Sequence, residues 1–145
     1  MTNTGLLRTL LIAGPVEDNG LQRSMFDRIL SPIERVRNCA GVLFQARCNP
    51  PRVIVCERDL PDGTWKDVLE IAASIPQPPP VIVTSRLADD YLWAEVLNLG
   101  GYDVLAKPFD PREVARTLKL AWDHLAHTAK SVRPDHRREE AYLTA

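Results

Sequence analysis

The sequence has little of what marks a nucleic-acid-binding, membrane or secreted protein. Its 145 residues carry 18 Lys and Arg against 19 Asp and Glu, a formal net charge of -1, so the basic field that favours nucleic acids and membrane surfaces is missing. No apolar run reaches the roughly 18 residues that span a bilayer. Arg8 interrupts the apolar run at 5–14, and no A-x-A cleavage site follows it. We therefore expect a cytoplasmic chain that binds neither nucleic acid nor membrane.

Cysteine is also scarce. Cys39, Cys48 and Cys56 are odd in number and form no C-x-x-C pair. A disulfide framework and a structural zinc site both need more cysteines at closer, regular spacings. We expect three reduced, buried thiols and no bound metal.

Short apolar runs alternate with helical patterns along the rest of the chain. Strand-length runs lie at 10–13, 53–56, 81–84 and 104–106, with a weaker one at 34–37. Unbroken apolar runs suit strands that are covered on both faces, as in a parallel sheet. Five strands alternating with helices predict an α/β fold with helices on both faces of the sheet.

Five helices are expected between these strands. One begins near Asp18 and carries Met25 and Ile29, and another covers 39–47. Thr64 with Asp67 forms a variant capping box before an apolar stripe of Trp65, Val68, Leu69 and Ala72. A fourth stripe of Leu92, Val96 and Leu99 ends at Gly100-Gly101. The fifth helix starts at Asp110-Pro-Arg-Glu113 and lines one face with Val114, Leu118, Ala121, Trp122 and Leu125.

Polar residues stand where three expected strands end. Glu57 opens the segment Glu57-Arg-Asp-Leu-Pro-Asp-Gly63, Thr84 ends the next strand, and Lys107 follows the last. In open parallel sheets, ligands bind beyond the carboxyl ends of the strands. We therefore expect the functional site at this edge.

These motifs resemble the receiver (CheY-like) domain of two-component response regulators over residues 6–129. The family's D-x-x-L-P pattern is matched by Glu57 to Pro61, its switch Thr or Ser by Thr84, and its K-P-F signature by Lys107, Pro108 and Phe109. The resemblance implies a flavodoxin-like three-layer sandwich. A five-stranded parallel sheet in the order 2-1-3-4-5 would carry five helices. We expect one domain at 1–129 and a charged tail at 130–145.

Three positions depart from the family pattern. Glu57 replaces the phosphoacceptor Asp, Gly14 and Pro15 replace the acidic pair after the first strand, and Val104 replaces the aromatic switch residue. In the family those carboxylates hold a Mg²⁺ ion, which needs several oxygen ligands. We therefore expect Mg²⁺ binding to be weak or lost, with no cofactor and no catalytic activity of the chain's own.

The longer side chain of Glu57 leaves two interpretations open. Its carboxylate could approach Lys107 and the Thr84 hydroxyl and so mimic a phosphoryl group, although with less charge than a phosphate. Alternatively, Glu57 and Lys107 form a plain ion pair that replaces a lost site.

The leading functional hypothesis is a stand-alone, atypical receiver in two-component (phosphorelay) signalling that acts by protein–protein contact. Its partner would be a histidine kinase or a downstream output protein. A homodimer through the last two helices and last strand is also possible by resemblance, and Trp93, Leu97 and Leu120 are expected to form an exposed patch there.

Two alternatives belong to other functional classes. A phosphorylatable receiver would use a shifted acidic site, with Glu17 and Asp18 supporting Glu57 or Asp59. A flavodoxin-like nucleotide or flavin binder would need an anion-binding loop after the first strand, where Glu17 and Asp18 instead add negative charge.

Overall fold

A computed structural model gives the fold of the chain and describes residues 9–14 and 32–130, with side chains described as far as residue 124. The expected first helix near Asp18 and the tail beyond residue 130 lie outside the described residues. So do Pro15, Glu17 and Asp18, on which the acidic-pair and shifted-site predictions depend. None of the described helices is long and apolar enough to cross a membrane.

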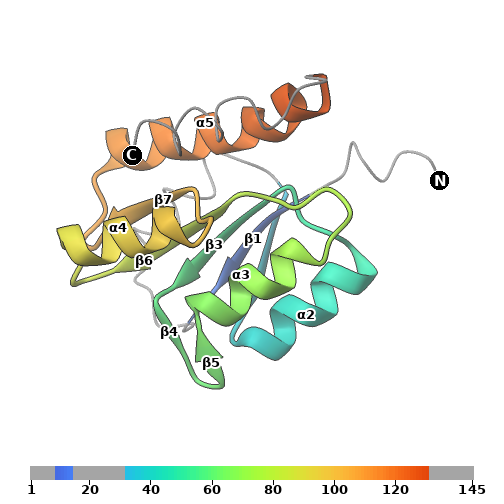
Figure 1. Ribbon diagram of the computed structural model, residues 1–145, viewed down its shortest axis with the longest axis horizontal. Coiled ribbons are helices and arrows are strands. Elements are labelled where there is room, and N and C mark those ends of the chain that lie inside the picture. The colour runs from blue at the N-terminus through green and yellow to red at the C-terminus, as the bar shows by residue number, and fades with distance from the viewer. Residues whose placement is uncertain (1–8, 15–31, 131–145) are drawn as a thin grey trace.

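The centre of the fold is a five-stranded parallel sheet (Figure 1). Its strands are β1 (Leu10–Ala13), β2 (Ile33–Val36), β3 (Val53–Glu57), β6 (Val81–Ser85) and β7 (Asp103–Ala106). They lie in the order β2-β1-β3-β6-β7, and every neighbouring pair is parallel. Counted along the chain, this is the predicted order 2-1-3-4-5.

Helices cover both faces of the sheet. The described helices are α2 (Cys39–Cys48), α3 (Trp65–Ala73), α4 (Asp90–Asn98) and α5 (Pro111–Lys130). In Figure 1, α5 crosses one face while α2, α3 and α4 lie on the other. The described residues thus contain four of the five predicted helices, and the three-layer α/β arrangement is as expected.

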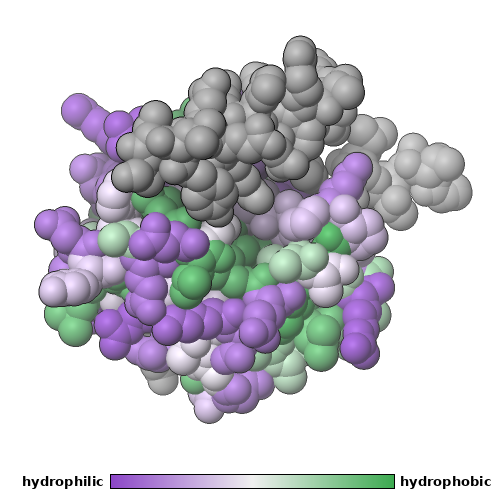
Figure 2. Space-filling view, in the orientation of Figure 1, coloured by the Kyte–Doolittle hydropathy of each residue, from purple (hydrophilic) through white to green (hydrophobic). Residues whose placement is uncertain are grey.

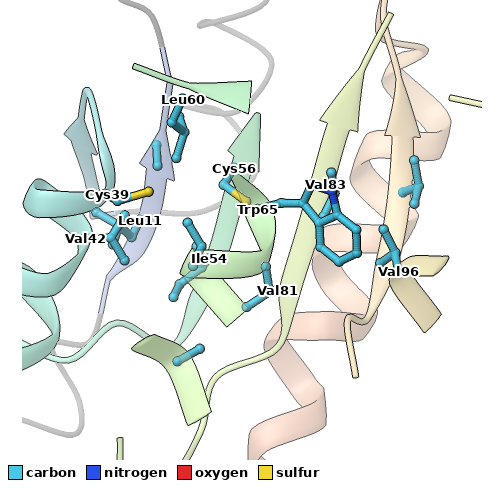
Figure 3. Close-up of a cluster of buried hydrophobic side chains, with 14 of the residues drawn as sticks. Leu11, Cys39, Val42, Ile54, Cys56, Leu60, Trp65, Val81, Val83 and Val96 are labelled. Carbon is cyan, nitrogen blue, oxygen red and sulfur yellow. The ribbon is translucent and has the colours of Figure 1, made fainter. Parts of the chain in front are cut away.

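Alternation along the strands divides the core into two clusters. Leu11, Ile54 and Val83 face the α2–α4 layer, whereas their neighbours Leu10, Val55 and Ile82 face α5. Figure 3 shows the first cluster, with the ring of Trp65 lying across the strands near Val83. Because each interior strand is buried on both sides, its sequence reads as an unbroken apolar run.

Helix starts follow the predicted caps. The Thr64 hydroxyl accepts from the Lys66 N–H at 3.2 Å, and the Asp67 carboxylate accepts from the Thr64 N–H at 2.9 Å. At α5, the Asp110 carboxylate accepts from the Arg112 N–H at 2.9 Å. These contacts satisfy N–H groups that have no partner inside the helix.

Two burial predictions are wrong. Leu99 is exposed, because it caps α4 rather than continuing its stripe, and Gly100 then turns the chain with a φ of 101°. Cys48 is exposed at the last residue of α2, while Cys39 and Cys56 are buried as expected.

Candidate functional site

The sheet register brings the predicted site residues to one edge. Glu57 is paired with Thr84 across β3 and β6. Ala13 is paired with Cys56 across β1 and β3, so Gly14 follows beside Glu57. Lys107 continues beyond β7, and its N–H donates to the Ser85 carbonyl at 3.0 Å. Residues from four strands therefore meet in one place, which we call the strand-end cleft.

Glu57 and Lys107 form an ion pair in the strand-end cleft. The Lys107 Nζ donates a hydrogen bond to the Glu57 Oε2. The side chains of Lys107 and Glu57 are only 8% and 19% exposed. The ammonium also lies 5.8 Å from the centre of the Phe109 ring. Water screens this pair little, so each charge depends on protein groups for its compensation.

Thr84 is buried, and its hydroxyl points into the sheet. Its Oγ1 donates to the Cys56 carbonyl at 3.4 Å, which is long for an O–H···O bond. A hydroxyl has one proton to donate, so the same proton does not reach the Glu57 carboxylate. Of the two contacts that a phosphate mimic would make, the Lys107 contact is present and the Thr84 contact is not. This geometry favours the plain ion pair.

A small cavity borders the Glu57 side of the pair. A cavity of about 10 Å³ lies against Gly14, Glu57, Thr84 and Phe109. That volume corresponds to about one water molecule. The Glu57 side chain thus forms part of the wall of a cavity too small for a larger anion.

The described residues of the cleft offer few oxygen ligands. Among the residues that end the described strands, Glu57 is the only carboxylate, and its Oε2 already accepts from Lys107. Gly14 contributes no side chain. These residues do not fit a Mg²⁺ ion, which takes carboxylates and other oxygens in near-octahedral geometry. Within 9–14 and 32–130, no three His, Cys, Asp or Glu side chains are grouped to hold a metal ion.

The segment after Glu57 forms a hairpin that the sequence did not predict. Strands β4 (Asp59–Leu60) and β5 (Gly63–Thr64) pair in antiparallel fashion around a Pro61-Asp62 turn. The Asp62 carboxylate reaches α2, where it accepts from the N–H groups of Cys39 at 2.7 Å and Ala40 at 3.0 Å. The Cys39 N–H, followed by that of Ala40, lowers the pKa of the Asp62 carboxyl below its ordinary value. The hairpin is thereby tied to a neighbouring helix.

Asp59, the alternative acceptor, lies away from the strand-end cleft. Its exposed carboxylate accepts from the Arg58 guanidinium at 3.1 Å. It lines a different surface cleft of about 320 Å³, between the start of α3 and the start of α4. The structure therefore brings Glu57, Thr84, Lys107 and Gly14 together and leaves Asp59 apart.

The remaining predicted residues fall into two groups. Val104 and Cys56 are packed in the α2–α4 core cluster. Burial raises the pKa of the Cys39 thiol to about 11 and that of Cys56 further still, so both thiols are poor nucleophiles. Trp93, Leu97 and Leu120 are exposed as predicted. In Figure 2, hydrophobic areas of the described surface lie scattered among hydrophilic ones.

Comparison with solved structures identifies the fold. A signal receiver domain from Vibrio parahaemolyticus superposes with a TM-score of 0.75 at 17% identity, covering 84% of this chain and 95% of that one. A Francisella response regulator receiver domain gives a TM-score of 0.64 at 23% identity over 81% of this chain and 98% of that one. A two-component response regulator from Clostridium difficile gives 0.65 at 20% identity over 86% and 99%.

At these identities the likeness establishes the fold: the chain has the receiver-domain fold of two-component signalling proteins. No protein-family model matches the sequence, and no curated protein matches it significantly.

Proposed function

We propose that this chain is an atypical receiver that signals by protein–protein contact, without metal-dependent phosphorylation of its own. One observation carries the proposal: a glutamate stands at the phosphoacceptor position and is bonded to Lys107. In a working phosphorylation site this lysine would serve the incoming phosphoryl group. Here its charge is compensated by a side chain that cannot leave.

Electrostatics supports the same conclusion. Phosphoryl transfer relies on cations that neutralise charge on the transferred oxygens. One carboxylate and one ammonium nearly cancel, so the described strand ends offer little net negative charge to attract Mg²⁺. Without Mg²⁺, an arriving phosphoryl group would meet the Glu57 carboxylate and be repelled by it. The chain is accordingly proposed to be neither an enzyme nor a Mg²⁺ binder.

Phosphorylation can be tested directly with a small donor. The purified chain is incubated with acetyl phosphate, with and without Mg²⁺, beside an ordinary receiver as positive control. Intact-mass spectrometry should show the phosphoryl adduct on the control and none on this chain. A stoichiometric, Mg²⁺-dependent adduct would refute the proposal. Its loss in Asp59→Asn or in Glu57→Gln would then identify the acceptor.

The output surface is proposed to lie on α4 and α5. Trp93 and Leu97 are one turn apart on α4, and Leu120 lies on α5; all three are exposed. Leu92 and Val96 fill the buried side of α4, so Trp93 and Leu97 are not needed for its packing. A second copy of the chain, or a signalling partner, would cover this patch. Light scattering at rising concentration tests self-association, and a monomer at every concentration would exclude the homodimer.

A further inference from the structure

We infer that Gly14 is a positioning residue for Glu57: the missing side chain at position 14 makes the room in which Glu57 reaches Lys107. Two departures from the receiver pattern, one on β1 and one on β3, then form a single coupled change. The inference rests on the proposed role of Glu57 as occupant of the strand-end cleft. Its test measures packing and not phosphorylation.

The register places the two residues side by side. Because Ala13 is paired with Cys56, Gly14 and Glu57 are the next residues on adjacent strands. A Cβ built on Gly14 would lie 2.7 Å from the Glu57 Cγ and 3.8 Å from its Cδ. Carbon atoms in contact normally lie about 3.5–4.0 Å apart. Even a methyl group at position 14 would therefore have to displace the Glu57 side chain.

Hydrogen bonds on both strands oppose a backbone movement that would relieve this clash. The Gly14 N–H donates to the Val36 carbonyl at 3.0 Å, which extends the β1–β2 ladder by one residue. On the other side, the Arg58 N–H donates to the Thr84 carbonyl at 2.9 Å and holds the chain just after Glu57. With both backbones fixed, the Glu57 side chain is what must give way.

The physical consequence concerns both charges. A displaced Glu57 carboxylate loses its contact with the Lys107 ammonium. The Lys107 side chain is only 8% exposed. When the glutamate moves away, the Lys107 amine should become more accessible to solvent and to reagents. A carboxylate at position 14, as in the ordinary receiver pattern, would be larger than a methyl group. It would also place a second negative charge beside Glu57.

A double-mutant cycle tests the coupling. Gly14→Ala is made in the natural chain and in a Glu57→Ala background, which lacks the Cγ that a new methyl would meet. Gly14 has a φ of 159°, a conformation that strains other residues, so Gly14→Ala has a backbone cost in both backgrounds. We expect Gly14→Ala to lower the melting temperature by roughly 3–6 °C more in the natural chain than in the background. Any cost from the backbone of residue 14 is common to both and cancels.

Gly101→Ala is the matched control. A Cβ there would lie 2.4 Å from the Val96 Cγ1 and 3.0 Å from the Val96 carbonyl oxygen, a tight fit in the loop between α4 and β7, away from the strand-end cleft. Its cost should be the same with Glu57 or Ala at position 57. Equal costs of Gly14→Ala in the two backgrounds would overturn the inference.

Lysine reactivity gives a second readout. Acetylation by a soluble reagent, followed by peptide mass spectrometry, should label Lys107 several-fold faster in Gly14→Ala than in the natural chain. The exposed Lys66 serves as internal standard. Unchanged Lys107 labelling in a folded Gly14→Ala protein would contradict the proposal. If Gly14→Ala fails to fold, a folded Gly14→Ala/Glu57→Ala protein supports it, and failure of both overturns it.

Discussion

Two lysine–glutamate pairs in this molecule have the same chemistry and opposite surroundings. Glu57 and Lys107 meet in the strand-end cleft with side chains 19% and 8% exposed. Lys66 and Glu95 bridge α3 and α4 at 2.8 Å, with side chains 54% and 46% exposed. Water can replace either partner of the second pair but has little access to the first.

The buried pair restricts the positions of its side chains in the site, whereas the exposed pair lies on the surface and restricts little. In the strand-end cleft, each charge was taken out of water and must be compensated by protein groups, so the glutamate has little freedom to leave its lysine. On the helices, two long side chains meet in solvent, where ordering them costs about as much as their attraction returns. Under the proposed function, the lysine compensated by Glu57 leaves no place for an incoming phosphoryl group.

The largest effect is expected from breaking the buried pair. Lys107→Met keeps an apolar stem but leaves Glu57 without this cation, and we expect the free energy of unfolding to fall by roughly 2–4 kcal/mol. Urea denaturation measures it. Glu57→Gln/Lys107→Met should recover most of that loss, because uncharged replacements of a buried pair are often tolerated. If the unfolding free energy of Lys107→Met lies within about 0.5 kcal/mol of that of the natural chain, the pair is screened by solvent and the comparison fails.

An intermediate effect is expected at Asp62, a carboxylate that bonds to backbone rather than to another charge. Its lowered pKa means that its contribution to stability is present above the pKa of the unfolded chain and is lost as pH falls through the lower folded value. Asp62→Asn should therefore melt a few degrees below the natural chain at pH 7.

The pH dependence provides the check for Asp62. The difference in melting temperature between the natural chain and Asp62→Asn should shrink between pH 5 and pH 3, while the natural chain itself loses stability. Asp59→Asn is the matched control, since Asp59 lies on the same hairpin but is exposed beside Arg58. A difference that stays constant with pH would mean that the Asp62 charge is not what ties the hairpin to α2.

The accuracy with which the sequence predicts the strands also differs between buried and exposed parts of the sheet. The strands β3 and β6 are buried on both sides, so their apolar runs predict them within one residue. At the edge of the sheet, β2 is only partly buried, and Glu34 and Arg35 break its apolar pattern. That strand was correspondingly the weakest of the five predictions.

The finer features of the site depend on contacts that no local pattern encodes. Strands β4 and β5 have two residues each, too few for a visible period, although Pro61-Asp62-Gly63 is a turn signal. The bond from the Asp62 carboxylate to the Cys39 N–H spans 23 residues. The proximity of Glu57 to Lys107 is predicted because both residues follow the carboxyl ends of parallel strands. The orientation of the Thr84 hydroxyl depends on atomic packing, which the sequence does not show.

The smallest effect is expected at the exposed pair, and its size sharpens the comparison. Glu95→Gln removes one charge while Lys66 keeps its place 5.8 Å from the Trp65 ring centre, so the variant isolates the ion pair from that ring contact. We expect a loss of about 0.3 kcal/mol, which 1 M salt should abolish because the pair is screened. The Lys107→Met loss should survive the same salt. A Glu95→Gln variant that loses more than about 1 kcal/mol of unfolding free energy, or a loss that salt leaves unchanged, would contradict the comparison. It would mean that the exposed pair stabilises the protein as strongly as the pair in the strand-end cleft.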